Sequence, residues 1–174
     1  MAKIIYKEGC EGQNKLSSIE GIEIDLLNGQ KALIFPKYSE EKLLERDYIT
    51  KLDARALSEI EALKVEDTVN EAVALFLLGS PAANWVFLFV TEDRRQFSLP
   101  SLLAAMEIQY QKEDIDALAE TIKGADLLRD FHSSVWSCSR GGLSSGWAAN
   151  DSYGYAYGGY LYSARLVVPT ILYR

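Results

Sequence analysis

Residues 136–165 constrain the fold of this chain more than any other stretch. They contain five tyrosines, six glycines and six serines among 30 residues, and no lysine, glutamate, glutamine or methionine. Tyrosine offers a large rigid contact surface with one hydrogen-bonding tip, while serine, glycine and asparagine adapt around it, as in antibody binding loops. The stretch therefore indicates a binding surface.

Apolar anchors within and after this stretch favour short strands joined by tight turns over a disordered linker. Trp136 and Trp147 bracket its first half, and an apolar run from 166 to 173 follows it. Its tyrosines alternate along the chain, which places rings on one face of a strand, first Tyr153, Tyr155 and Tyr157, then Tyr160 and Tyr162. An inert, solvated strand face stays open as the alternative to a binding face.

The first half of the chain predicts a hairpin followed by helices. Two apolar runs, 22–26 and 31–35, flank an Asn-Gly pair, which is a strong hairpin signal. Ser39 is expected to cap a helix over 40–48, and a capping box at 50–53 is expected to open a second helix that ends near Leu63.

The middle of the chain predicts one buried strand and two further helices. The apolar run 85–90 fits a buried strand, and the Gly-Ser-Pro before it breaks the chain. A helix capped by Ser98 or Leu99, with Pro100 in its first turn, is expected to run to about residue 111. The next helix is expected over 114–122, with Gly124 as its stop signal.

Length and charge indicate one acidic domain that can bury a sizeable core without metals or disulfides. The 174 residues carry a net charge of −7, and residues 1–130 alone carry −9. Such a balance argues against nucleic acid as a partner, because phosphate binding needs clustered lysine and arginine. Cys10 and Cys138 are expected to be free thiols.

The sequence shows no secretory signal and no apolar run of membrane length, so we expect no membrane insertion. The expected location is the cytoplasm where the protein is made, or a virion that carries it away from there.

The order of several short motifs resembles a known family. Leu99, Pro100 and Ser101 precede a helix, Trp136 opens a Trp-Ser strand, and Val168 and Pro169 open a final apolar strand. This order is similar to C-type-lectin-fold domains of bacterial surface and phage tail proteins, and it covers about residues 97–173. Some of those domains are variable proteins of diversity-generating retroelements, which contact ligands through the strands and loops after the Trp-Ser motif.

The resemblance implies an α+β fold in which helices pack on short antiparallel strands. A C-type-lectin-like domain over 71–174 would follow an N-terminal hairpin and helical extension over 1–70, the two forming one compact unit. Between residues 140 and 166, most residue types can arise from an Asn codon by changes at its adenines, as retroelement diversification would produce. The alternative is that strands rich in turns favour the same residue types. The Glu-Pro-Asn calcium signature of the family is absent, so no metal is expected.

Catalytic motifs are also absent. The single histidine, His132, has no acid or nucleophile at a recognisable spacing, and no phosphate-binding loop or zinc-protease motif occurs. The leading interpretation is a non-catalytic ligand-binding protein without cofactor, such as a phage receptor-binding protein. A structural or assembly protein that uses the tyrosine face for subunit contacts, as an oligomer, and an enzyme with an unrecognised site are the alternatives.

The expected partner is a protein or glycan on a cell surface, because glycine-flanked tyrosines make a broad shallow face. We expect residues 141–145, 149–153 and 156–165 to be exposed display positions. The predicted ligand-binding residues are Arg140, Ser144, Asn150, Ser152, Tyr153, Tyr157, Tyr160, Tyr162 and Arg165.

Overall fold

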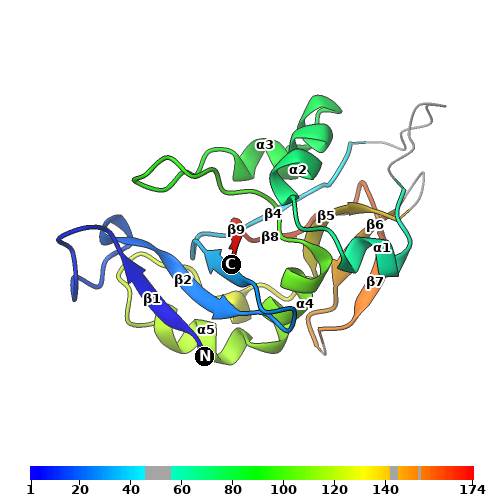
Figure 1. Ribbon diagram of the computed structural model, residues 1–174. Coiled ribbons are helices and arrows are strands. Elements are labelled where there is room, and N and C mark those ends of the chain that lie inside the picture. The colour runs from blue at the N-terminus through cyan, green and yellow to red at the C-terminus, as the bar shows by residue number, and fades with distance from the viewer. Residues whose placement is uncertain (46–55, 142–144, 153) are drawn as a thin grey trace.

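The computed structural model describes residues 1–45, 56–141, 145–152 and 154–174, and its mixed α+β architecture confirms the expected class. Its strands form two sheets (Figure 1), one in the order β1-β2-β3-β9 and one in the order β4-β8-β5-β6-β7. The strands are β1 Lys3–Tyr6, β2 Ile19–Asp25, β3 Lys31–Ile34, β4 Ser39–Glu41, β5 Val135–Arg140, β6 Ser145–Ala149, β7 Ala156–Tyr160, β8 Arg165–Val167 and β9 Thr170–Tyr173.

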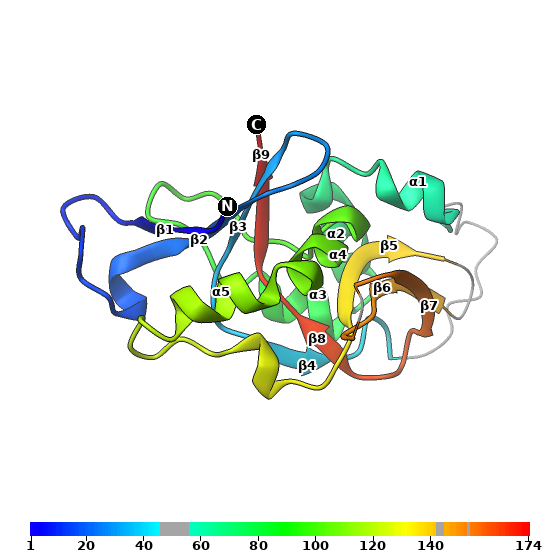
Figure 2. The ribbon, with the colours of Figure 1, turned by 90° about the horizontal axis from the view of Figure 1, so that it is seen from below.

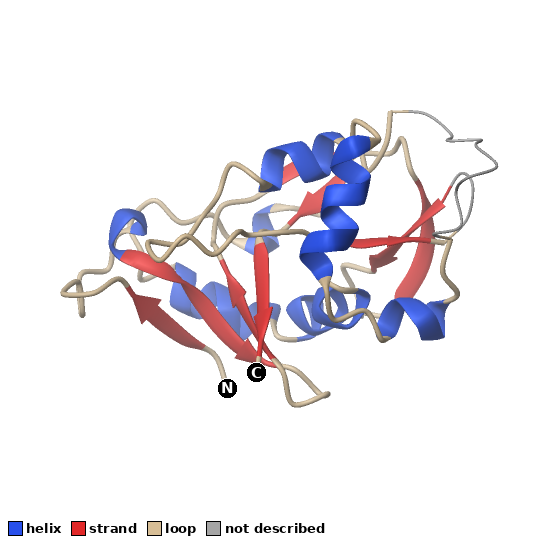
Figure 3. Ribbon diagram, turned by 45° about the horizontal axis from the view of Figure 1, so that its top comes forward, coloured by secondary structure: helices blue, strands red, loops and turns tan. Residues whose placement is uncertain are grey.

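Five α-helices are present in the described residues, and Figure 3 shows how they lie against the strands. They are α1 Glu59–Leu63, α2 Thr68–Leu77, α3 Pro81–Val86, α4 Leu102–Tyr110 and α5 Lys112–Ala119. Helix α4 contacts both β5 and β6, and α5 contacts β2. These two helices were expected from the sequence, and both are present with shifted ends.

The start of α4 lies later than expected. Ser101, and neither Ser98 nor Leu99, is the capping residue, because its hydroxyl accepts a hydrogen bond from the Ala104 N–H at 3.1 Å. Pro100 therefore precedes the helix. Helix α5 begins at Lys112 and ends at Ala119, and the turn after it reaches Gly124, whose φ of 90° suits glycine.

The four-stranded sheet contains the expected hairpin, which is confirmed. Strands β2 and β3 pair with Asp25 opposite Lys31, and Gly29 has a φ of 80° in the turn between them. Ile22 and Ile24 belong to a core shared with α4 and α5, whereas Leu33 on the other face belongs to a second core. The sheet is therefore covered on both sides.

Two predictions for the N-terminal half were wrong in part. Residues 39–41 form the short strand β4 where a helix was expected, because pairing with β8 outweighs local helix preference in this acidic segment. Residues 46–55, including the proposed capping box, lie outside the described residues. The following helix begins only at Glu59, where Ser58 and Glu61 form a capping box.

The predicted strand at 85–90 is also wrong. Residues 81–86 form α3, whose cap is Ser80 accepting from the Ala83 N–H at 3.1 Å, with Pro81 in the first helical position. A serine followed by proline can start a helix as readily as it ends one. The N–H of the first helical residue has no partner within the helix, so proline, which lacks an N–H, loses no hydrogen bond at that position. The local capping signal thus outweighs the apolar run.

The five-stranded sheet curls strongly along its length, and we call it the curled sheet (Figure 2). Its first and last strands approach each other, since the Leu161 carbonyl after β7 accepts hydrogen bonds from the Leu43 and Leu44 N–H groups after β4. Strands β5, β6 and β7 are antiparallel, as expected, whereas β8 runs parallel to β5. The curl encloses an apolar interior.

Trp136 of β5 lies in this interior. Its side chain is fully buried, and its indole N–H donates to the Glu41 carbonyl of β4 at 2.9 Å. Gly146 of β6 leaves the space for it, because a Cβ there would lie 3.0 Å from Trp136 Cζ3 and 2.6 Å from Leu43 Cδ2. Trp147 is half-buried and donates to the Leu57 carbonyl at 2.8 Å. Both tryptophans were expected to be at least partly buried, and this is confirmed.

The chain segments before and after residue 70 share both sheets. β3 pairs with β9, and β4 pairs with β8. Residues near the N-terminus thus obtain their strand partners from residues 165–173.

Glu23 of β2 is a buried carboxylate in a small charged network. It accepts hydrogen bonds from Lys31 Nζ at 2.8 Å and from the Tyr173 hydroxyl, and Lys3 Nζ lies 3.1 Å away. Burial on its own would raise the pKa of Glu23, but the hydrogen bonds from Lys31, Tyr173 and Lys3 outweigh it and lower the pKa to about 2. The hydrogen bond to Glu23 likewise raises the pKa of Lys31.

Replacing Trp136 by alanine should lower the free energy of unfolding by about 3–5 kcal/mol, because the change leaves a cavity inside the curled sheet. Trp136→Phe keeps most of the ring contacts, loses the bond to Glu41, and should cost less. Urea unfolding of both variants measures the difference. A loss below about 1 kcal/mol for the alanine variant would mean that the curled sheet does not depend on this ring.

Acid should weaken the fold through Glu23. Its pKa in the folded protein lies below the ordinary 4.5, so its contribution is present above that pH and is lost as the pH falls from about 4.5 to about 2. We expect the stability difference between the protein and Glu23→Gln to shrink by roughly 2–3 kcal/mol across this window. Urea titrations at several pH values measure it, and a constant difference would contradict the assignment.

Candidate functional site

Exposed aromatic side chains of the curled sheet lie just before β7, at its end and in the turn after it. Tyr155, Tyr160 and Tyr162 expose 54%, 61% and 45% of their area, and Gly158 between them is also exposed. We call Gly158, Tyr160 and Tyr162 the tyrosine surface. In Figures 1 and 2, β7 lies at the outer rim of the molecule.

Tyr160 and Tyr162 form a stacked pair. Their ring centroids lie 5.5 Å apart, and the ring planes differ by 18°. Leu161 between them is fully buried and bonded through its carbonyl to the chain after β4, and the Ser163 N–H donates to the Tyr160 carbonyl at 3.1 Å. The rings are thus held on a backbone that is fixed from both sides, which reduces the entropy lost when they contact a ligand.

A layer of polar and aromatic side chains supports β7 from inside. The Arg165 guanidinium lies 5.1 Å from the Trp136 ring centroid and 5.2 Å from that of Tyr157. Arg165 Nη1 donates to the Tyr157 hydroxyl at 2.5 Å, and that hydroxyl donates to Ser134 Oγ at 2.6 Å. Arg165 and Tyr157 therefore connect β7 to β8 and to the start of β5 inside the curled sheet.

The two adjacent glycines of β7 have different surroundings. A Cβ on Gly159 would lie 2.6 Å from Arg165 Nε and 2.8 Å from Nη2, so a methyl group there would require the guanidinium to move. A Cβ on Gly158 would meet nothing closer than Ser145 Cβ at 3.8 Å. Gly159 therefore allows Arg165 to pack against β7, whereas Gly158 leaves an uncovered place on the surface.

The other end of β7 lies beside helix α4. Gly154 has a φ of 69° and packs so closely that a Cβ there would lie 3.1 Å from the Met106 carbonyl oxygen. Lys112 Nζ donates to the Asp151 carbonyl at 2.9 Å. A hollow of about 290 Å³ opens here, and Tyr110, with 81% of its area exposed, stands at its side. Its lining is Gln109, Tyr110, Lys112, Glu113 and Ser152.

The structure separates the predicted ligand-binding residues into groups. Ser152, Tyr160 and Tyr162 are exposed, whereas Arg140 is 4% exposed and lies beside Leu75, Leu78 and Cys138. The half-buried members are Asn150, Tyr157 and Arg165. Ser144 and Tyr153 lie outside the described residues.

Several expected display positions are instead buried. Ala149 and Leu161 are fully buried, and Gly159 is covered by Arg165. The alternation of a strand explains this result, because every second residue of β6 and β7 points into the curled sheet or onto α4. The residue types of this stretch do not by themselves distinguish the exposed side of its strands from the supporting side.

Two contributors were missed from the sequence. Tyr110 ends a helix that was expected, but helical spacing alone did not distinguish its exposed position from a buried one. Ser134 precedes β5, and its Oγ accepts a hydrogen bond from the hydroxyl of Tyr157, which lies 23 residues away in the sequence, so no local pattern could indicate it.

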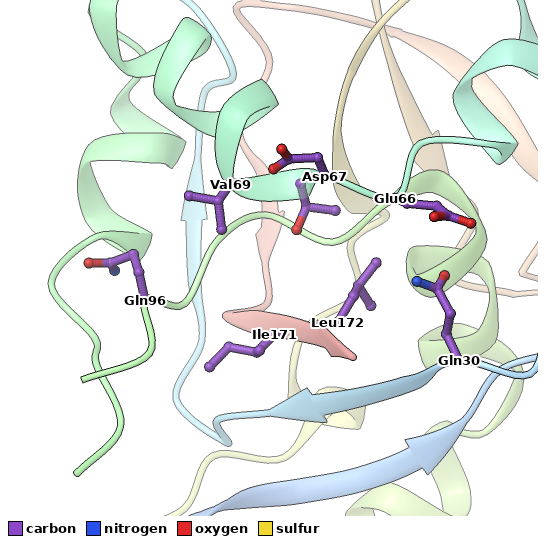
Figure 4. Close-up of a pocket in the computed structure, with 8 residues that line it drawn as sticks. Gln30, Glu66, Asp67, Val69, Gln96, Ile171 and Leu172 are labelled. Carbon is purple, nitrogen blue, oxygen red and sulfur yellow. The ribbon is translucent and has the colours of Figure 1, made fainter. Parts of the chain in front are cut away.

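Another hollow, of about 340 Å³, lies between the loop entering α2 and strand β9 (Figure 4). Its polar groups hold the fold together. Asp67 caps α2 by accepting from the Asn70 N–H at 3.0 Å, and the Gln96 amide nitrogen donates to the carbonyls of Phe87, Phe89 and Phe97. These contacts leave Asp67 and Gln96 engaged within the protein.

Nucleophiles and metal ligands do not converge in the part of the chain that the structure describes. Burial raises the pKa of Cys138 to about 12, which keeps the thiol protonated, and Cys10 is also free. His132 lies in an exposed loop. Among residues 1–45, 56–141, 145–152 and 154–174, no three His, Cys, Asp or Glu side chains form a group that could hold a metal ion.

No helix in these ranges has both the length and the apolar character needed to cross a bilayer. Comparison of the chain with protein-family models, curated proteins and solved structures finds no match.

The two glycines of β7 should respond differently to alanine. Gly159→Ala should cost about 1–3 kcal/mol, because the methyl group displaces the Arg165 guanidinium. Gly158→Ala is the matched control and should change stability by less than about 0.5 kcal/mol. Thermal and urea unfolding compare them. Equal effects would show that Arg165 does not pack on β7 in this way.

Proposed function

We propose that this protein is a non-catalytic ligand-binding protein whose binding site is the tyrosine surface. The observation that carries the proposal is the exposed, stacked Tyr160–Tyr162 pair on a backbone fixed by buried Leu161. Tyrosine is enriched among residues whose truncation costs binding energy at interfaces. A pair held in one arrangement contributes such contacts at low entropic cost.

The proposed ligand is a surface of another molecule, either a protein or a glycan on a cell. The tyrosine surface is an outer rim of a sheet, whereas small cofactors favour concave apolar pockets. A phage receptor-binding role belongs to this proposal, and so does retroelement-type diversification. Exposed Ser152, Gly158, Tyr160 and Tyr162 are the positions that can vary without a change in the buried layer beneath them.

The C-type-lectin-like architecture is part of the same proposal. Its motif segments lie close together: the Cys138 N–H of β5 donates to the Pro100 carbonyl at 2.8 Å, and the Ser98 N–H donates to the Thr170 carbonyl at 3.0 Å. Trp136 of the Trp-Ser motif is fully buried. These contacts support a common structural role for the motif segments.

The proposal is tested by changing both exposed rings. Glycan arrays and arrays of purified cell-surface proteins are probed with the full chain and with the Tyr160→Ala, Tyr162→Ala double variant. We expect binding to fall at least about tenfold in the double variant, because each ring contributes contact area. Phe76→Ala on α2, which removes an aromatic ring that is 43% exposed, is the control and should bind normally.

Both variants should keep the melting temperature within a few degrees, since the changed rings are exposed. Ligands that bind the double variant as tightly as the unchanged protein would place the site elsewhere. Absence of any ligand on either array would remove the support for a display function.

A further inference from the structure

We propose that the open edge of β7 binds an extended peptide segment of the protein ligand, which adds to the curled sheet as a sixth strand. This inference rests on the proposed function and names its ligand class. It is carried by the directions of the backbone groups of β7, an observation independent of the tyrosine rings.

The hydrogen bonds of β6 fix those directions. The Asn150 N–H donates to the Tyr155 carbonyl at 2.9 Å, so Tyr155 turns its backbone groups toward β6. Successive residues of an antiparallel strand turn theirs to opposite sides. Residues 157 and 159 therefore also bond to β6, while Ala156, Gly158 and Tyr160 turn their N–H and C=O groups to the open edge.

The other side of β6 agrees with this alternation. The Gly141 N–H donates to the Ser145 carbonyl at 2.9 Å, so Ser145 faces β5 and its neighbour Gly146 faces β7. Gly146 is paired with Gly159, as the alternation requires. At the open edge, the Ser163 N–H donates to the Tyr160 carbonyl. Outside the pairing of β7 with β6, no backbone group of a described residue bonds to the backbone of Ala156 or Gly158.

The remaining sheet edges are protected, whereas no described residue pairs with the outer edge of β7. Edge strands usually carry charges, bulges or a cover that prevents pairing with another chain. β1 has Lys3 and an irregular register at Ile5, and β4 has two glutamates in three residues. β9 is covered by pairing of Thr170 with Ser98. β7 has neither a charge nor a proline, and its register with β6 is regular.

The side chains beside this edge define the segment that fits. Gly158 is opposite Trp147 in the β6–β7 register, so a peptide residue next to Gly158 places its side chain over the glycine toward the half-buried indole. Large apolar or aromatic side chains fill such a place well. The stacked Tyr160–Tyr162 pair lies at one end of the strand, and the hollow beside Tyr110 and Ser152 lies toward the other.

A peptide suits this edge better than a second copy of the chain. The five residues of β7 span roughly 17 Å. Two of them, Ala156 and Gly158, turn N–H and C=O groups outward to which no backbone group of a described residue bonds. A stable interface between two copies needs roughly 1,000 Å² of buried surface, and so short an edge supplies only a few main-chain bonds toward it. A peptide gains main-chain bonds along the edge and side-chain contacts at Trp147 and Tyr160.

The test uses a random linear dodecapeptide library, selected against the full chain. The affinity of each enriched peptide is measured by calorimetry for the unchanged protein, Gly158→Pro, Gly158→Ala and the Tyr160→Ala, Tyr162→Ala variant. Proline removes the outward N–H at an edge position where it is tolerated, while alanine keeps it. Both substitutions add atoms where the peptide side chain lies, but only proline removes the N–H, so we expect affinity to fall at least about tenfold further in Gly158→Pro than in Gly158→Ala.

Amide hydrogen exchange of the unchanged protein supplies a second measurement that does not depend on any variant folding. The Gly158 N–H should exchange at least about tenfold more slowly when the selected peptide is bound. Absence of enriched peptides, an unchanged affinity in Gly158→Pro with an unprotected Gly158 amide, or a dimer that Gly158→Pro converts to monomer would each overturn the proposal.

The two proposals fail separately. Loss of peptide binding in the tyrosine double variant alone would keep the tyrosine surface as the site and reject strand addition. Loss in Gly158→Pro alone would keep strand addition and reject the aromatic pair as the anchor.

Discussion

The structure depends on the burial of Trp136 inside the curled sheet. The indole reaches from β5 to β4, where it bonds to the Glu41 carbonyl, and its face supports the Arg165 guanidinium. Arg165 in turn holds Tyr157 and lies against Gly159, so one buried ring connects four of the five strands. The curl brings the end of β7 to the chain after β4, and this contact fixes Leu161 between the two exposed tyrosines.

The order of contacts explains why a surface rich in flexible residue types can be well defined. Gly158 and Gly159 lose much conformational freedom on folding, and without supporting contacts two glycines would weaken a strand. Here the layer of Trp136, Arg165 and Tyr157 holds the strand from inside, while its outer edge stays open. Rigidity and accessibility therefore come from opposite sides of the same strand.

Sequence reasoning succeeded where one local signal decides the structure. The Asn-Gly turn predicted the β2–β3 hairpin, and the proline and glycine signals predicted the presence of α4 and α5, although not the residues at which they begin. It failed at 39–41 and 85–90, where a distant strand and a Ser-Pro cap outweighed composition. For the site, composition indicated Tyr160 and Tyr162 as exposed, but it could not separate them from Arg140 or Arg165. Burial of those arginines depends on Trp136, Cys138 and α2, which lie elsewhere in the chain.

The interleaving of the two chain ends has a consequence for the order of folding. The strands before residue 42 are synthesised first. However, β3 pairs with β9 and β4 pairs with β8, and both partners lie more than 120 residues later in the chain. Contacts of such large sequence separation slow folding, because a long loop must close before they form. A nascent chain would therefore expose the edges of β3 and β4 until its last strands are made, and during that interval it is most open to pairing with other chains.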